Sequence, residues 1–234
     1  MNSFFRHAKI WATSQPTIYQ SYCRLFKPSL AKYLPNSGTD LFISGYPRSG
    51  NDYLKQLTKS YNSEIKISSH FHKVGAFKLA LKLSVPVVAV IRDPIESISS
   101  SMVKYKEELK LKEFPIYPIF DYVFFHKELL KNRDQMTIIS FEATINDPIY
   151  YYSKLENELG IHKKHQIKDI DLTVNKINEK LNNANMDHNR IDALKKGPDQ
   201  GKELLKSKAK VIIDENKKVK DKALRLYDEL IKYT

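Results

Sequence analysis

The sequence has almost no cysteine and no long apolar run. Its single cysteine, Cys23, excludes an intrachain disulfide and a cysteine-based metal site, and is typical of a reducing compartment. The first twenty residues contain no apolar stretch of signal-peptide length, and no later window approaches the roughly 18 apolar residues of a membrane span. We therefore expect a soluble, cytoplasmic protein that does not associate with a membrane.

Negative charge is scarce compared with positive charge. Lysine and arginine number 39 against 27 aspartate and glutamate residues, which gives a formal net charge of +12. This excess favours an anionic partner, such as a nucleotide, a sulfated or phosphorylated substrate, nucleic acid or acidic membrane. Charge alone does not choose among them. Much of the excess lies in Lys-rich runs after residue 190, which are typical of solvated helix faces.

Apolar residues are sufficient for one well-filled domain over residues 1–234, since 41% of the chain is hydrophobic and 11% aromatic. β-Forming runs and helical spacing of apolar residues alternate along the chain. The expected strands cover 41–45, 64–68, 85–91 and 136–141, and the expected helices cover 51–61, 76–83, 93–109, 117–132, 147–161 and 219–233. This alternation predicts an α/β fold with a central parallel sheet of about four to five strands flanked by helices.

The chain is expected to have three parts within that single domain. Residues 1–38 contain three prolines and end in "PNSGTD", which predicts a turn-rich lead-in. Residues 39–160 hold the alternating strands and helices of a nucleotide-binding core. Residues 161–234 lose the β pattern and predict a mainly helical C-terminal part.

A glycine loop joins the first expected strand to the following helix. The stretch "GYPRSGNDY" places Gly45 and Gly50 five residues apart, as in the first part of the GxxxxGK[ST] phosphate loop. Asn51 and Asp52 then stand where ATP and GTP enzymes place the Lys and Ser/Thr that contact the terminal phosphate and Mg²⁺. A metal-dependent nucleotide triphosphatase is therefore disfavoured.

A cation inside the loop could supply the missing positive charge. Arg48 has a forked guanidinium that suits bidentate contact with phosphate or sulfate oxygens. The alternative is a glycine-bearing turn with Arg48 exposed on the surface, and the loop by itself does not separate these two interpretations.

Four segments, in order, resemble motifs of the PAPS-dependent sulfotransferases, where PAPS is 3′-phosphoadenosine 5′-phosphosulfate. "YPRSGNDYL" is similar to their 5′-phosphosulfate loop. "VVAVIRDPIESISSS" resembles their 3′-phosphate motif, with Ser100 eight residues after Arg92 (100 − 92 = 8). "IISFEATINDPIYYYSKLENELGI" resembles a later stretch, with Phe141 where a Tyr near the adenine is usual. "SSHFHK" resembles the segment that carries the catalytic base, and His70 precedes Arg92 by 22 residues (92 − 70).

The resemblance implies a P-loop-NTPase-like fold and the transfer of a sulfuryl group from PAPS to a hydroxyl or amine. The acceptor would be a small molecule or glycan, the product 3′,5′-ADP, and no metal is required. It also implies a role for each matched residue. The loop would hold the 5′-phosphate through Arg48, Ser49, Gly50, Asn51 and Asp52, and Arg48 would also stabilise the charge on the bridging oxygen. Arg92 and Ser100 would bind the 3′-phosphate. Phe141 would contact the adenine, and His70 would deprotonate the acceptor.

Asp52 departs from the family pattern, because its counterpart is a hydroxyl that donates to a phosphate oxygen, whereas a carboxylate only accepts and repels a dianion. Three outcomes are open. Asp52 turns aside as an N-cap-like group, a nearby cation neutralises it, or donor binding is weakened or altered.

Other assignments also keep alternatives. His72 is the second candidate for the base, and Ser68 stands where the family has a lysine, for which Lys73 is the candidate substitute. Arg92 could instead form a structural ion pair with Glu96 or Asp93. Neighbouring serines compete with Ser100: Ser97, Ser99 and Ser101.

The segment "LKKGPDQGK" (194–202) faintly resembles a family segment that closes over the 3′-phosphate. Lys195, Lys196 and Gly197 would then contact the nucleotide as a lid, with Lys202 about where the family has a Trp. A solvated basic turn is the other interpretation.

The acceptor is not identified by the sequence. Acceptor-binding elements would fall in residues 1–35, 106–125 and 165–195, and four aromatic residues could line an apolar pocket or pack in the core: Tyr117, Phe120, Tyr122 and Phe124. Rival functions are a non-catalytic PAP-binding or nucleotide-binding descendant and a nucleotide or sugar kinase. A nucleic-acid partner is not expected, because no recognised binding module accompanies the basic tail.

Overall fold

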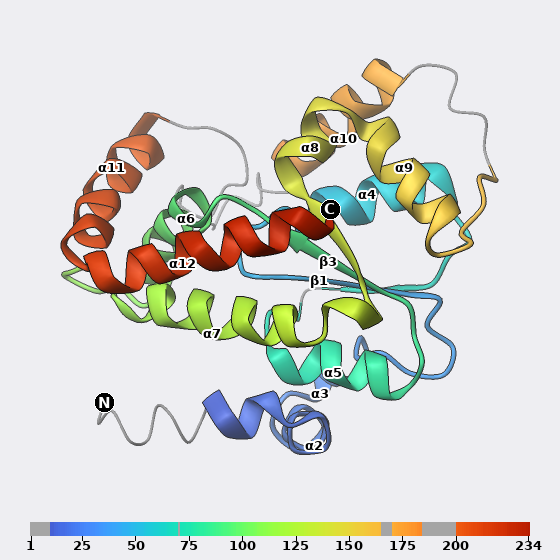
Figure 1. Cartoon of the computed structure of the whole chain (residues 1–234), viewed down its shortest axis with the longest axis horizontal. Coiled ribbons are helices and arrows are strands. Elements are labelled where there is room, and N and C mark those ends of the chain that lie inside the picture. Colours follow the sequence, from blue (N-terminus) through green and yellow to red (C-terminus); the bar gives the residue numbers. More distant parts are fainter. Residues whose placement is uncertain (1–9, 70, 165–169, 184–199) are drawn as a thin grey trace.

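The computed structural model describes residues 10–69, 71–164, 170–183 and 200–234. Four strands form one parallel sheet in the order β2-β1-β3-β4. They are β1 (Leu41–Gly45), β2 (Ile67–Ser68), β3 (Val87–Ile91) and β4 (Thr137–Ser140). Helices cover both faces of the sheet (Figure 1), which confirms the predicted α/β class.

Most of the chain outside the sheet is helical. The helices and 3₁₀ turns are α2 (Pro16–Phe26), α3 (Pro28–Ala31), α4 (Asn51–Tyr61), α5 (Val74–Lys82), α6 (Pro94–Glu108), α7 (Tyr117–Lys131), η1 (Arg133–Gln135), α8 (Phe141–Asn146), α9 (Pro148–Asn157), α10 (Ile170–Asn183), α11 (Gln200–Glu215), α12 (Lys217–Leu230) and η3 (Ile231–Tyr233). Their ends follow local chemistry. Asp93 caps α6 by accepting from the Glu96 backbone N–H, and Gly160 follows α9 with a φ of 62°.

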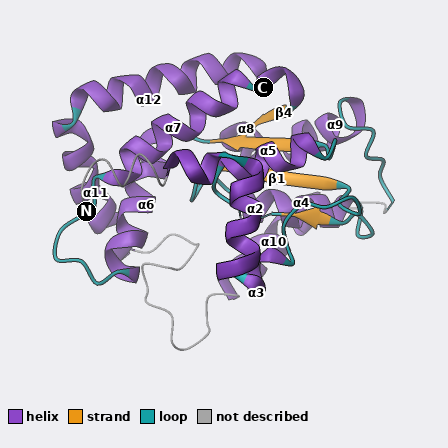
Figure 2. Ribbon diagram, turned by 90° about the horizontal axis from the view of Figure 1, so that it is seen from below, coloured by secondary structure: helices purple, strands orange, loops and turns teal. Residues whose placement is uncertain are grey.

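Two apolar cores lie on opposite faces of the sheet. Successive residues of the central strands alternate between them, so that Phe42 joins one core while Leu41 and Ile43 join the other. One core includes buried side chains of α2, α5, α6, α7 and α12, and the other those of α4, α9 and α10. Figure 2 shows the sheet between these helical layers. Burial on both faces explains the unbroken β-branched sequence of β3.

The structure differs from the expectations at three places. The strand expected over 64–68 is limited to Ile67–Ser68. Phe141 begins α8 and does not end the preceding strand, because the Ser140 hydroxyl accepts from the Ala143 backbone N–H and caps a helix there. The stretch read as a turn-rich lead-in contains α2 and α3, because proline in the first turn of a helix starts it and does not break it.

The fold brings two loops together at one edge of the sheet. Strands β1 and β3 are parallel neighbours, so the loop after β1 and the residues after β3 both leave from the carboxyl ends of the strands. In open α/β sheets ligands bind at this edge. Within the part of the chain that the structure describes, no helix is long and apolar enough to cross a membrane.

Candidate functional site

The loop between β1 and α4 has the geometry of an anion cradle. Arg48 and Gly50 both have left-handed backbone, with φ of 70° and 94°, which turns the chain sharply into α4 at Asn51. Gly45 is required by close packing, since a Cβ there would lie 2.5 Å from a methyl of Val90. The turn leaves the first backbone N–H groups of α4 at the carboxyl edge of the sheet, where they suit a phosphate.

Five of the predicted donor-site residues meet at this loop. Arg92 donates from Nη1 to the Arg48 carbonyl oxygen (2.9 Å), and Arg48 donates from Nε to the Ser100 hydroxyl (3.0 Å). The guanidinium carbon of Arg92 lies 4.8 Å from the centroid of the Phe141 ring. That ring packs against Gly50, where an added Cβ would lie 2.2 Å from it. Segments far apart in the sequence thus form one cluster.

The two acidic residues suggested as partners of Arg92 have other contacts. Asp93 caps α6, and its backbone N–H donates to Glu142. Glu96 accepts from Lys206 and Lys210.

The charge balance of the loop is positive. Burial lowers the pKa of Arg48, and the nearby charge of Arg92 lowers it further, whereas Asp52 and Glu108 raise it. Asp52 therefore acts electrostatically on Arg48, which supports neutralisation by a nearby cation among the three outcomes open for Asp52. An anion that contacts both guanidinium groups would offset the repulsion that Arg92 exerts on the buried Arg48.

The Ser49 hydroxyl at the loop also suits a phosphate. Within the part of the chain that the structure describes, the Ser49 hydroxyl and the Asn51 Oδ1 are buried and have no hydrogen-bond partner. Buried polar groups are normally satisfied, so such atoms mark places where a ligand or water completes the bonding. The Ser49 hydroxyl can donate to an oxyanion, so the loop passes this test for a phosphate-bearing donor.

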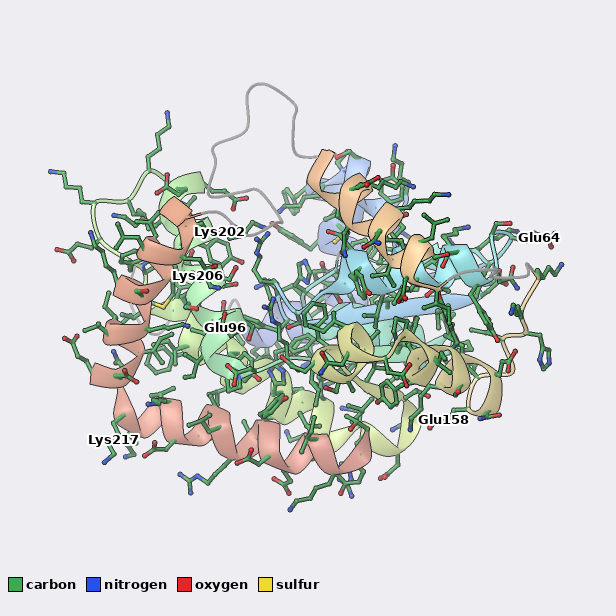
Figure 3. The ribbon with its side chains drawn as sticks, turned by 90° about the horizontal axis from the view of Figure 1, so that it is seen from above. Glu64, Glu96, Glu158, Lys202, Lys206 and Lys217 are labelled. Atoms are coloured by element: carbon green, nitrogen blue, oxygen red, sulfur yellow. The ribbon has the colours of Figure 1, made fainter. Side chains whose placement is uncertain are left out.

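Helix α11 contributes two buried lysines, of which the sequence interpretation placed Lys202 at the end of a turn or lid. Lys202 and Lys206 are 7% and 8% exposed. Figure 3 shows both on the inner side of α11, with Glu96 of α6 beside Lys206. Burial lowers the pKa of Lys202 to about 8, and the charges of Arg48, Lys206 and Arg92 add to this effect, opposed by Glu203. The four-residue spacing of Lys202, Lys206 and Lys210 was a sequence signal for one helix face.

The histidine segment lies next to the loop. His70 lies outside the described residues. His72 Nδ1 lies 2.9 Å from the Gly45 carbonyl oxygen. A carbonyl only accepts, so Nδ1 donates, and Nε2 of the neutral ring is then an acceptor. Ser68, which stands where the family has a lysine, donates to the Tyr33 carbonyl oxygen (2.6 Å).

A cavity adjoins the same loop. Its lining comes from the N-terminal segment, the loop, the histidine segment and α6 with α7: Ile10, Thr13, Tyr46, Pro47, His72, Lys73, Val74, Tyr105, Asp121, Phe124 and Phe125. Of the aromatic residues considered for an acceptor pocket, Phe124 lines this cavity. Tyr122 is fully buried in the core, Tyr117 packs against Tyr105, and Phe120 is 40% exposed.

The predicted lid residues, Lys195, Lys196 and Gly197, lie outside the described residues, and metal-binding groups can be sought only in the rest of the chain. Among the residues that the structure does describe, no group of three or more His, Cys, Asp or Glu side chains could hold a metal ion.

Comparison with known proteins found similarity in structure only. No family model matches the chain, and no curated protein matches it. Among solved structures the chain is similar to a crystal structure of mouse sulfotransferase SULT7A1 complexed with PAP. The likeness covers 87% of this chain and 86% of that one, at 17% sequence identity and a TM-score of 0.42.

Proposed function

We propose that this protein is a PAPS-dependent sulfotransferase that moves a sulfuryl group to a hydroxyl or amine of a small molecule or glycan and releases 3′,5′-ADP. The observation that carries the proposal is the pairing of two arginines at the carboxyl edge of the sheet. Arg92 bonds to the backbone of Arg48, which lies in a left-handed loop that opens α4. The loop has no Lys-Ser/Thr pair for a metal-bound triphosphate, so its cations suit another polyanion.

The donor would be held by groups of the loop and of the strands beside it. The backbone from Arg48 to Asp52 and the N-terminus of α4 bind the 5′-phosphate, together with the Ser49 hydroxyl. Arg92 and Ser100 would bind the 3′-phosphate, and Phe141 would contact the adenine. PAPS, when bound, would supply the sulfuryl group and a phosphate leaving group.

The chain's own residues act by positioning and by charge. Arg48 stabilises the negative charge that grows on the bridging oxygen as the S–O bond to it breaks. A base takes the acceptor's proton as the new S–O bond forms. His70 is the base that the motif predicts, and His72 is the alternative, because its Nε2 is an acceptor and its ring lines the cavity beside the loop.

The cavity beside the loop is the proposed acceptor pocket. It combines the aromatic side chains of Tyr46, Tyr105 and Phe124 with the polar groups of Lys73 and Asp121. This composition favours an acceptor with an apolar ring and a polar group. Lys73 lines the same cavity, which supports its substitution for the lysine that the family has in place of Ser68.

A second candidate is a non-catalytic protein that binds PAP or a related nucleotide. It is favoured by Asp52, whose carboxylate stands where a donor is usual, and by Ser68, whose hydroxyl bonds to the backbone of Tyr33. Such a protein would bind 3′,5′-ADP and PAPS without turnover.

Calorimetric titration with 3′,5′-ADP tests the donor site, with ADP plus Mg²⁺ as the competing ligand. We expect about micromolar binding of the bisphosphate alone. Arg92→Ala should weaken it by about tenfold or more, since a charge-assisted contact to phosphate is lost. Arg225→Ala, which removes an exposed arginine of α12, is the matched control and should leave it unchanged.

The outcomes separate the candidates. Release of 3′,5′-ADP from PAPS with a panel of phenols, alcohols and amines supports the enzyme, and its loss in His70→Ala or His72→Ala identifies the base. Binding without release for any acceptor favours the non-catalytic protein. Preference for ADP with Mg²⁺, or no binding of 3′,5′-ADP, overturns both in favour of a kinase-like or other use of the loop.

A further inference from the structure

Three lysines form a row on the face of α11 that packs against α6. Lys202, Lys206 and Lys210 are spaced by four residues, so they lie one above the other on one side of the helix. Helices α11 and α6 are in contact, and Figure 3 shows this side of α11 turned towards Glu96. Lys202 and Lys206 of this row are buried although lysine is usually exposed, whereas the Lys210 side chain is 37% exposed.

The two lysines at the C-terminal end of the row, Lys206 and Lys210, attach α11 to α6. Glu96 accepts from Lys206 at 2.8 Å and from Lys210 at 2.5 Å, so one carboxylate joins α6 to two successive turns of α11. The carboxyl of Glu203 adds a bond to Lys206 at 3.0 Å. We call Glu96, Lys206 and Lys210 the α6–α11 clasp.

Lys202 lies one turn beyond the clasp, towards the loop. Lys202 is 7% exposed, and the charges that act on it include those of Arg48 in the β1–α4 loop, Arg92 after β3, and Lys206 and Glu203 of α11. Arg48, Arg92 and Lys206 are positive. The charges of Asp52 and Glu108 also act on Arg48. An anion that contacts Lys202 and the two arginines would offset the repulsion among these positive groups.

We propose that Lys202 is a third cation of the donor site, which contacts the phosphate groups held by Arg48 and Arg92, and that the α6–α11 clasp positions it. This rests on the proposed function. It assigns a binding residue to α11 itself, in addition to the predicted lid residues, which lie outside the described chain. It also gives the site a positive charge that offsets Asp52 and the missing lysine of the loop.

Titration with 3′,5′-ADP of Lys202→Gln and Lys202→Arg tests this inference. Lys202→Gln should weaken binding by about tenfold to a hundredfold, the range for one charge-assisted bond, and Lys202→Arg should keep most of the affinity. Lys208→Gln is the matched control, because Lys208 is an exposed lysine of the same helix. It should change affinity by less than about twofold.

A second measurement, on the unaltered protein, does not depend on a variant that folds poorly. Burial and neighbouring positive charges lower the pKa of Lys202 to about 8, and an anion beside it favours the charged form, so binding at about pH 8.5 should take up protons. The heat of titration should then depend on the ionisation enthalpy of the buffer. Lys202→Arg, which stays charged, should abolish this proton uptake without loss of binding.

Each result decides between the two proposals. If the unaltered protein binds 3′,5′-ADP while Lys202→Gln binds as tightly as Lys208→Gln, the role of Lys202 is overturned and the donor site stands. Binding without proton uptake at this pH also overturns it. If the unaltered protein does not bind 3′,5′-ADP at all, the proposed function fails, and the inference fails with it.

Discussion

Gly50 lies where the loop packs against the Phe141 ring. Its φ of 94° is a conformation that side-chain-bearing residues rarely adopt, and the Phe141 ring fills the space where a Cβ would lie. That ring also stacks with Arg92. Backbone conformation, ring position and guanidinium position are thus coupled through one residue.

Gly50→Ala is therefore expected to act on both stability and binding. We expect a loss of at least about 2 kcal/mol in the free energy of unfolding, from backbone strain plus displacement of Phe141, measured by chemical denaturation. Binding of 3′,5′-ADP should weaken in parallel because Arg92 loses the ring on which it lies.

Gly160→Ala is the control for strain alone. Its φ is 62°, but nothing lies within 4 Å of the added Cβ, so the expected cost is about 1 kcal/mol with no effect on binding. Equal losses of stability in the two variants, with binding intact in both, would contradict the coupling through Phe141.

At the scale of elements, the α6–α11 clasp and buried apolar residues of α11 attach this helix to the rest of the fold. Ala209 and Ile213 of α11 are fully buried, beside the polar contacts of Glu96. Burial opposes ionisation of Glu96, but hydrogen bonds from Lys206 and Lys210 and their charges together lower its pKa to about 2. The carboxylate thus contributes stability above its ordinary pKa of 4.5 and loses it as pH falls towards 2.

Glu96→Gln should loosen α11 without unfolding the sheet. Because Lys206 would remain buried without its partner on α6, we expect faster amide hydrogen exchange throughout α11 and weaker binding of 3′,5′-ADP. Asp214→Asn is the control. It breaks the ion pair between Asp214, which is largely exposed, and Lys220, and it should leave the amides of α11 protected from exchange. Unchanged exchange in Glu96→Gln would show that apolar packing alone holds the helix.

At the scale of the whole molecule, His126 is a buried histidine whose ionisation opposes folding. His126 is fully buried in α7, its ring stacks on Tyr122 at 3.7 Å between centroids, and Tyr46 and Phe125 surround it. Burial lowers its pKa from 6.5 to about 4, so the folded protein holds the neutral ring. Between these values the unfolded chain binds the additional proton, so stability falls as pH falls.

His126→Phe should reduce the acid sensitivity of the fold. Between about pH 7 and about pH 4.5 His126 should account for a loss of about 2 kcal/mol in the free energy of unfolding. Urea denaturation at both values, compared between the unaltered protein and His126→Phe, isolates this contribution from that of the carboxylates. The same pH dependence in both proteins would mean that His126 is charged or solvated in the fold.

The sequence by itself determined the elements whose causes are local. Apolar runs of β-branched residues predicted β1, β3 and β4, Asp-Pro pairs predicted the starts of α6 and α9, and two glycines located the loop. Residues 16–31 were read as turns because proline at the first turn of a helix and proline in a turn look alike in sequence. The residues of the donor-site cluster came from a family resemblance, not from local pattern.

Only the tertiary structure decided which of these residues meet. Arg48 and Arg92 are neighbours because β1 and β3 are adjacent and parallel, and the helices after them begin at the same edge. Lys202 could not be placed from its spacing, since a row of lysines on a helix is usually solvated. Docking of α11 on α6 buries it beside two arginines. The sequence determines which residues are charged. Their burial and their distances to other charges, which set the electrostatic energy, arise only when distant segments pack together.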